Sequence, residues 1–293
     1  MGSNMSGMRY EAPGSVDEAV TLLAEAKGAA RVLAGGTDLL VQLRAGMISP
    51  DLVVDIKKIA ETRDITGNGS GFSIGASVSG AEMGEDAKLL AAWPGVVEGA
   101  ELIGSTQIQS RATMAGNLCN ASPAADSVPA LIAAGATCTV AGPKGQREVP
   151  VKDIPTGPGK TSLGKGEFIV NIKLPARPTY ASDAYLRMIP RTEMDIAIVG
   201  AGVNLVLDDS GTCTAACVVL GAVGPTTIIV ADAAAALIGS KVDAAALAAV
   251  SVAASAAASP IDDKRGTIEY RTKVAGVLAS RAAAIAADRA RSK

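Results

Sequence analysis

Residues 32–39 read Val32-Leu33-Ala34-Gly35-Gly36-Thr37-Asp38-Leu39, with two consecutive glycines between a short apolar run and a leucine-rich segment. The apolar run at 30–34 predicts a strand, and the leucines after Asp38 predict a short helix. Glycines at such a corner let main-chain N–H groups approach an anion, and a helix N-terminus favours negative charge. The stretch therefore indicates a phosphate-binding turn, although glycines between a strand and a helix more often serve only the turn itself.

A second glycine-containing stretch, Thr113-Met114-Ala115-Gly116-Asn117, lies in a polar and poorly periodic segment from 103 to 117. We expect this segment to be an ordered loop, in which Gly116 exposes backbone donors and Asn117 offers both a donor and an acceptor. Asp126, nine residues further on, could accept hydrogen bonds from sugar-like hydroxyls. It could also cap the helix expected from 126 to 134, and spacing alone favours that role.

A third glycine stretch, Val199-Gly200-Ala201-Gly202-Val203, begins like a dinucleotide-binding fingerprint. Its third glycine is missing, and residues 206–208 continue as strand and turn rather than as a helix. We interpret it as a strand that carries glycines.

Composition excludes several classes of function. The chain has 293 residues, enough for two domains, and only 2% of them are aromatic. Single-stranded nucleic-acid binding relies on aromatic stacking, and the formal charge of -2 gives no basic stripe for a phosphate backbone. We therefore expect no nucleic-acid partner.

The chain contains no histidine. This excludes Ser-His-Asp and Cys-His nucleophiles and the usual zinc sites, so a cofactor is expected to carry the chemistry. Four scattered cysteines without a secretion signal favour reduced thiols and a cytoplasmic location. The Ala-rich run at 243–259 is too short and too weakly apolar to span a bilayer, so no membrane span is expected.

The periodicity along the chain predicts an α+β fold. An amphipathic helix is expected at 15–27, where Ser15 and Glu18 have capping-box spacing. Strands are expected at 167–174, 181–188, 196–207 and 213–223, followed by Ala-rich helices that end with a long one at 267–290 carrying Arg271 on its polar side. The first 175 residues or so would form one region, and the remainder an antiparallel sheet covered by helices.

Four motifs occur in order: Ala-Gly-Gly-Thr-Asp at 34–38, Thr-Met-Ala-Gly-Asn at 113–117, Ser-Pro-Ala-Ala-Asp at 122–126 and Gly-Ala-Val-Gly-Pro-Thr at 221–226. Together they resemble the FAD-binding medium subunit of molybdenum hydroxylases, the family of carbon monoxide dehydrogenase and xanthine dehydrogenase. The resemblance implies a PCMH-like FAD-binding domain at 5–176, made of two subdomains split near 57–70. A C-terminal domain of the carbon monoxide dehydrogenase flavoprotein type would follow at 177–290.

The resemblance also implies roles for individual residues. Val32 to Leu39 and Thr113 to Asn117 would cradle the pyrophosphate of FAD from opposite sides, and Asp126 would hold polar groups of the cofactor. Ile103 and Ile169 would line the flavin pocket, unless they are simply core residues.

Two positions depart from the pattern of the resembled family. Arg187 stands where relatives commonly have a lysine near the flavin ring, so the charge is kept but the point-like ammonium is not. Ala115 replaces the first glycine of a Gly-Gly pair, which is tolerable only if its φ is negative.

The function implied by the resemblance is electron transfer. The chain would be an oxidoreductase subunit with FAD as its only cofactor, no catalytic side chain of its own and no metal. It would relay electrons from a small 2Fe-2S subunit, itself fed by a large molybdopterin subunit, to a terminal acceptor. A self-sufficient FAD-dependent oxidase or reductase is the alternative, and a scaffold subunit that holds no cofactor is a third possibility.

Overall fold

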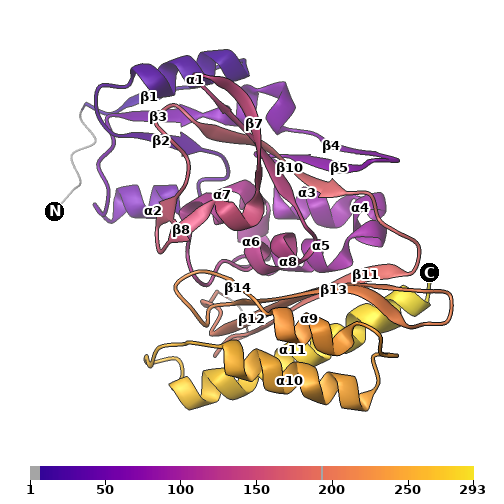
Figure 1. The fold of residues 1–293 in the computed structure, drawn as a ribbon. Helices are drawn as coiled ribbons and strands as arrows, with labels where there is room; N and C mark the ends of the chain where they lie inside the picture. Colours follow the sequence, from indigo (N-terminus) through magenta and orange to yellow (C-terminus); the bar gives the residue numbers. More distant parts are fainter. Residues whose placement is uncertain (1–6, 193) are drawn as a thin grey trace.

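The computed structural model describes residues 7–192 and 194–293. Figure 1 shows a parallel sheet at the N-terminal end, a larger antiparallel sheet with short helices in the middle, and a second antiparallel sheet with long helices at the C-terminal end. Among the described residues, no helix is both long and apolar enough to cross a membrane.

The N-terminal unit is a three-stranded parallel sheet. Its strands are ordered β1 (Arg9–Glu11), β3 (Leu52–Asp55), β2 (Ala30–Leu33), with α1 (Val16–Glu25) and α2 (Leu39–Arg44) in the connections. The predicted first helix is confirmed, because the Ser15 side chain accepts from the amide of Glu18. Strand β1 was not predicted, since Arg-Tyr-Glu has no apolar alternation and pairs only with a distant strand.

The middle unit is a five-stranded antiparallel sheet whose central strand comes last along the chain. Its order is β4 (Ile65–Asn68), β5 (Gly71–Gly75), β10 (Phe168–Pro175), β6 (Thr137–Gly142), β7 (Gly145–Pro150). The short pair β8 (Pro155–Gly157) and β9 (Lys160–Thr161) precedes the central strand. The helices between β5 and β6 are α3 (Gly80–Glu85), α4 (Ala87–Ala92), α5 (Pro94–Glu101), α6 (Thr106–Gln109), α7 (Met114–Asn120) and α8 (Ser127–Ala133).

The expectation of a loop from 103 to 117 was wrong in part. Residues 106–109 form α6, and residues 114–117 are the first part of α7. These helices have four and seven residues, so neither is long enough to show a helical hydrophobic period. Thr113 is the N-cap of α7, because its side chain accepts from the amide of Gly116. This capping signal was not used in predicting the segment.

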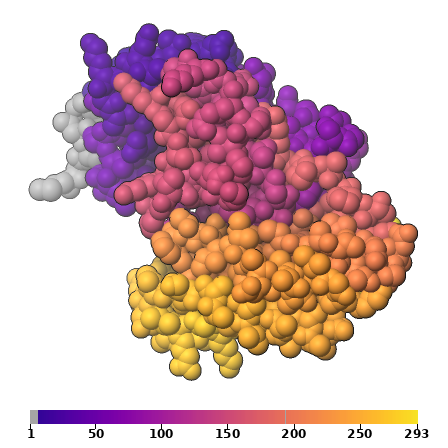
Figure 2. All heavy atoms as spheres, in the orientation of Figure 1, coloured from indigo at the N-terminus to yellow at the C-terminus, as the bar shows by residue number. Residues whose placement is uncertain are grey.

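The C-terminal unit is the predicted antiparallel sheet covered by helices. Its strands β11 (Ala181–Met188), β12 (Val199–Leu207), β13 (Cys213–Gly221) and β14 (Ile228–Ile229) pair in that order. Helices α9 (Ala231–Leu237), α10 (Ala244–Ala257) and α11 (Ile268–Arg291) share a second apolar core with this sheet. Figure 2 shows this unit packed directly against the middle unit.

Arg271 does not lie on the polar side of the last helix, as we had expected. Its side chain is 5% exposed, and it binds Asp263 at 2.6 Å and the carbonyl of Ile198 at 3.1 Å. The guanidinium thus joins a loop carboxylate to the start of β12, a role that helical spacing cannot reveal.

Two glycines, Gly202 and Gly221, allow helix α8 of the middle unit to lie on the C-terminal sheet, and a third, Gly200, makes room for a neighbouring side chain. A Cβ added at Gly202 would lie 2.7 Å from the carbonyl group of Pro129, and one at Gly221 would lie 2.7 Å from the Pro129 ring. A Cβ at Gly200 would meet the Tyr185 hydroxyl at 2.6 Å. The interpretation of 199–205 as a strand carrying glycines is therefore confirmed, and the glycines serve packing rather than phosphate binding.

A buried ion pair closes the same joint between the two units. Asp183 on β11 accepts from the amide of Val96 at 2.9 Å and pairs with Arg177 at 2.5 Å. The Arg177 guanidinium also lies 3.7 Å from the centre of the Trp93 ring. Because Asp183 is desolvated, its pKa is raised, and the arginine partly offsets that burial.

Substituting Gly202→Ala should destabilise the protein by about 1–3 kcal/mol, because the new methyl group would overlap the Pro129 backbone. Urea denaturation followed by the fluorescence of Trp93, the chain's single tryptophan, would measure the loss. Gly14→Ala is a matched control, since nothing lies within 4 Å of that added methyl. Equal stability of both variants would contradict the packing account.

Candidate functional site

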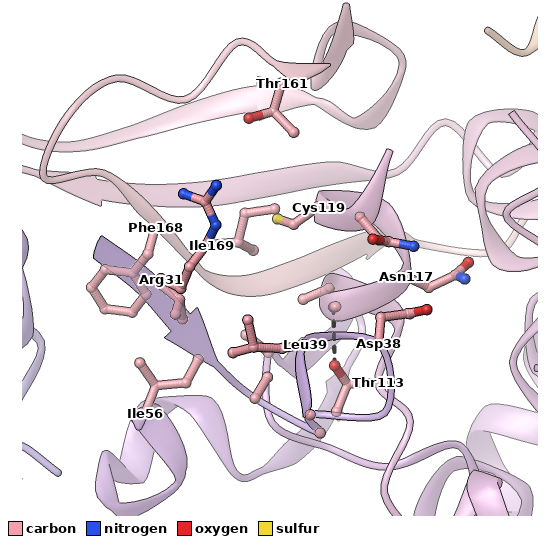
Figure 3. A pocket seen from close by; sticks show the side chains of 18 of the residues that line it. Arg31, Asp38, Leu39, Ile56, Thr113, Asn117, Cys119, Thr161, Phe168 and Ile169 are labelled. Atoms are coloured by element: carbon pink, nitrogen blue, oxygen red, sulfur yellow. Dashed lines mark hydrogen bonds between the residues drawn. The ribbon is translucent and has the colours of Figure 1, made fainter. Parts of the chain in front are cut away.

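A cavity of about 630 Å³ opens where the parallel sheet, helix α7 and strand β10 meet (Figure 3). Its volume falls within the roughly 300–1,000 Å³ typical of small-molecule sites. The lining includes every candidate residue from the sequence except Leu33, Met114, Asp126 and Arg187. The two glycine stretches and the two isoleucines, Ile103 and Ile169, are thus brought to one place.

The first glycine stretch lies against the backbone of the two residues that precede the second stretch. A Cβ added at Gly35 would lie 1.8 Å from the carbonyl oxygen of Arg111 and 3.2 Å from the Cα of Ala112. The second stretch is anchored from behind, because the amide of Gly80 donates to the carbonyl of Ala112 at 2.9 Å. A side chain at Gly35 would separate the two stretches, so this glycine sets the distance between the opposing walls.

The turn after β2 is held open toward the cavity. Gly36 has a φ of +81°, which suits glycine, and Lys57 donates to the carbonyl of Ala34 at 3.1 Å. Leu33 lies beneath the turn, where its side chain would be 2.8 Å from a Cβ at Gly36. It therefore supports the turn from the core rather than lining the cavity.

Helix α7 begins at the opposite wall. Thr113 caps it, and the capping bond occupies the amide of Gly116 at 3.0 Å. The first amides of a helix have no acceptor within the helix, so that of Ala115, which lines the cavity, is the donor this end offers to a ligand. Ala115 has helical backbone geometry, so its methyl group meets the condition of a negative φ.

Asn117 is oriented by a neighbouring helix. Its side-chain oxygen accepts from the hydroxyl of Ser127 at 2.8 Å and from the amide of Ser127 at 3.2 Å. The other half of its side-chain amide is thereby fixed as a donor at the cavity wall.

Asp126 and Arg187 form a buried pair outside the cavity lining. Arg187 donates to one carboxylate oxygen of Asp126 at 2.7 Å, and the Tyr185 hydroxyl donates to the other at 3.0 Å. Asp126 makes no capping bond to α8, so the capping role favoured by spacing was wrong. Burial raises the pKa of Asp126 to about 6, although Arg187 and Tyr185 both act to lower it.

One wall of the cavity was not predicted from the sequence. Residues 159–168, from the β8–β9 turn to the start of β10, contribute Gly159, Thr161, Leu163, Gly164, Glu167 and Phe168. The amide of Gly159 donates to the carbonyl of Ala121 at 2.9 Å, which ties this wall to the end of α7. No local signal marks these residues, because a Gly- and Lys-rich turn is typical of any exposed hairpin.

Other missed residues come from elements that were predicted for different reasons. Gln42 on α2 donates to Asn120 on α7 at 3.1 Å and so bridges the two sides of the cavity. Cys119 also lines the cavity, but burial raises the pKa of its thiol to about 12, so it stays protonated. The remaining lining residues that were not predicted are Ala30, Arg31, Met47, Ile48, Ile56, Ala76 and Ala112.

Among the described residues, no group of three or more His, Cys, Asp or Glu side chains could hold a metal ion. All four cysteines are free thiols. The walls instead present backbone amides at two glycine stretches and apolar side chains between them. This arrangement defines a class of protein that binds a phosphate-linked organic cofactor in a cavity of this size.

Comparison with known proteins agrees with that class. Residues 5–177 match the family model "FAD binding domain in molybdopterin dehydrogenase", and residues 184–286 match "CO dehydrogenase flavoprotein C-terminal domain". The carbon monoxide dehydrogenase medium chain of Afipia carboxidovorans is 34% identical over 96% of this chain and 97% of its own length. The putative xanthine dehydrogenase FAD-binding subunit of Escherichia coli is 33% identical over 75% of each chain.

The structural likeness is equally extensive. A chain of the reconstituted CO dehydrogenase from Oligotropha carboxidovorans superposes with a TM-score of 0.91 at 32% identity, covering 96% of this chain and 98% of that one. The chain belongs to the family of FAD-binding medium subunits of molybdenum hydroxylases. It is an oxidoreductase component, and its cofactor is FAD.

The cavity fits this cofactor on its own geometry. Close backbone approach at Gly35 leaves amides rather than side chains at the wall. A diphosphate bound there would be met by hydrogen-bond donors without an opposing carboxylate from α7, whose sequence contains no acid.

Substituting Gly35→Ala should abolish or strongly reduce FAD retention, because the new methyl group would overlap the carbonyl of Arg111. We expect at least a ten-fold weaker affinity, measured by titration of the flavin-free protein with FAD. Gly69→Ala is the control, since open space surrounds that position. A Gly35→Ala protein that stays fully yellow through gel filtration would refute the proposed contact.

Substituting Arg187→Leu should cost about 3–5 kcal/mol of stability at pH 7.5, because it leaves the Asp126 carboxylate buried and unpaired. The folded pKa of Asp126, about 6, already exceeds its unfolded value, so its contribution to stability is full at low pH and is lost as pH rises through 6. Removing Arg187 raises that pKa further. The loss caused by the substitution should therefore be smaller at pH 5 than at pH 7.5.

Urea denaturation at both pH values measures this difference. Lys173→Met, which breaks an exposed pair with Glu148, should cost less than about 1 kcal/mol. A loss for Arg187→Leu that is the same at both pH values would mean that Asp126 does not respond to the missing charge.

Proposed function

We propose that this chain is the electron-relaying subunit of a multi-subunit molybdenum hydroxylase. Electrons would arrive from the 2Fe-2S clusters of a small partner subunit, which a large molybdopterin subunit reduces, and would leave to a terminal acceptor. The observation that carries the proposal is the meeting of the two glycine stretches at one cavity, in a chain that covers nearly the whole length of a medium chain.

The chain's own part would be to bind and orient the cofactor. We propose that Val32 to Leu39 and Thr113 to Asn117 hold the pyrophosphate from opposite sides, through amides that need no reorganisation on binding. Ile103 and Ile169 are both less than 10% exposed and would exclude water from the ring system. Bound FAD supplies the redox chemistry, which matches a chain without histidine.

The buried pair at the joint would set the charge near the cofactor. Arg187 alone would favour an anionic reduced ring, as its position in the family implies, but here its charge is offset by Asp126 at 2.7 Å. With the pKa of Asp126 near 6, the pair is neutral above that pH and carries one positive charge below it. We propose that Asp126 and Arg187 act together: Arg187 supplies a fixed charge, and Asp126 takes up a proton only below about pH 6.

The two parts of the chain would divide the work. We propose that residues 5–176, split near 57–70, carry the cofactor, and that residues 177–290 close the joint beside it. Contacts across that joint, such as Asp183 with Val96, support a fixed relation between the two parts. We also propose a cytoplasmic location, consistent with four free thiols.

Purification of the native complex through a tag on this chain tests the proposal. We expect two further chains to co-purify, one with 2Fe-2S absorbance and one with molybdopterin, and one FAD per copy of this chain. In stopped-flow spectra, substrate should bleach the flavin only when both partners are present.

Two results would contradict the relay. If the isolated chain oxidised an organic substrate at a steady rate, it would be a self-sufficient flavin oxidase or reductase. If the purified chain were colourless and did not bind added FAD, it would be a scaffold.

A further inference from the structure

We propose that Lys57 is a positioning residue, which orients the glycine turn after β2 for binding the diphosphate of the cofactor. Its ammonium group is the last member of a hydrogen-bonded chain that starts at Tyr10 and passes through Asp55. The inference rests on the proposed function, in which main-chain amides of this turn bind that diphosphate. Tyr10, Asp55 and Lys57 do not line the cavity, so they act on the turn from outside it.

The first argument is that the turn has amides without an acceptor in the protein. Within residues 7–192 and 194–293, the amides of Gly35, Gly36 and Thr37 donate to no main-chain carbonyl. All three residues line the cavity. Free amides at a cavity wall are donors for the oxygens of an anion, provided that they point toward it.

The second argument is the geometry of the peptide that links Ala34 to Gly35. A trans peptide points its carbonyl and its N–H in opposite directions. Lys57 donates to the carbonyl of Ala34 at 3.1 Å, so the amide of Gly35 is directed away from Lys57. Because Gly35 lines the cavity and Lys57 does not, this direction aims the donor at the ligand. Glycine leaves the peptide free to rotate, so its direction needs such an anchor.

The third argument is that Lys57 is itself held in place. Its Nζ lies 2.8 Å from one oxygen of Asp55, and the Tyr10 hydroxyl donates to the other oxygen at 2.6 Å. Burial acts to raise the pKa of Asp55, but hydrogen bonds from Lys57 and Tyr10 outweigh it and leave that pKa below its usual value. The carboxylate therefore stays charged at neutral pH and fixes an otherwise flexible side chain.

The parallel sheet brings these residues together. Asp55 ends β3 and pairs with Leu33 at the end of β2, which the glycine turn follows. Tyr10 lies on β1, the strand on the other side of β3 (Figure 1). The carboxyl ends of parallel strands meet at one edge of a sheet, and open α/β sheets bind ligands at that edge. The strand β1, which was not predicted, thus supports the site through its tyrosine.

The chain acts by orientation rather than by net charge. The ammonium of Lys57 and the carboxylate of Asp55 neutralise each other, and the Tyr10 hydroxyl is neutral. Removing a lysine that does not contact the turn should therefore leave cofactor binding unchanged, even when it lies next to Lys57.

The test measures FAD affinity by titrating the flavin-free, full-length protein and following flavin fluorescence. We expect Lys57→Met to bind FAD about ten-fold more weakly, because one misdirected donor to a charged group is worth roughly that factor. Lys57→Arg keeps a cation that can reach both the carboxylate and the carbonyl, so it should recover affinity to within about three-fold of wild type. In Lys57→Met, Asp55 keeps the Tyr10 hydroxyl and the main-chain amide of residue 57 as donors, so the urea midpoint should change little.

The matched control is Lys58→Met, which removes the same charge from the same short helix, Ile56–Lys58. Lys58 is exposed and forms no ion pair within the described residues. This variant should bind FAD like the wild type. A loss in Lys57→Met no larger than that in Lys58→Met, or one that Lys57→Arg does not reduce, would overturn the inference.

If Lys57→Met does not fold, Tyr10→Phe tests the same hydrogen-bonded chain with a smaller change. Loss of the hydroxyl should weaken FAD binding about two- to five-fold, and an unchanged affinity would count against the inference. A wild-type protein that binds no FAD would instead contradict the proposed function, so the two failures are distinguishable.

Discussion

The backbone of Gly35 lies against the carbonyl group of Arg111, and the geometry of the site depends on that contact. It holds the turn after β2 and the start of α7 at a fixed separation, with main-chain donors on both sides of one cavity. Because the contact is between backbones, no side chain can be inserted without moving a wall. The supporting interactions act on the same two stretches: Lys57 fixes the carbonyl of Ala34, and Gly80 fixes the carbonyl of Ala112.

Glycines also matter where the cofactor-binding part packs against the C-terminal unit. Glycines at 202 and 221 let helix α8 lie on the sheet, and the buried Arg177–Asp183 pair closes one edge of the joint. A buried ion pair is weak evidence for stability in itself, but breaking one is costly, so such a pair fixes the relative position of two units. Asp126, Tyr185 and Arg187 span the same joint beside α8. The position of the C-terminal unit and the charge near the proposed flavin ring are therefore physically connected.

The charged side chains around the cavity differ in whether they have a partner within the protein. Of the two acidic lining residues, Glu167 is neutralised by Arg147, whereas Asp38 makes no capping bond to α2 and burial raises the pKa of its carboxyl. Arg31 alone among the described lining residues offers an uncompensated positive charge. The predicted phosphate-binding turns supply neutral backbone donors. A diphosphate bound there would be held by hydrogen bonds rather than by several charged side chains.

Sequence by itself determined the elements whose signals are local. The cap at Ser15, the strand at 181–188 and the long helix after Thr267 all depend on neighbouring residues, and each was predicted close to its observed bounds. The glycine stretches at 35 and 116 could also be recognised, because the resemblance rests on ordered motifs. Only the tertiary structure decided that Asp126 faces Arg187 instead of capping α8, that Arg271 is buried, and that residues 159–168 and Arg31 complete the cavity. Those features depend on contacts between segments far apart in the chain. Periodicity and capping depend only on residues close together in the sequence, so they do not predict which distant residue will be the neighbour.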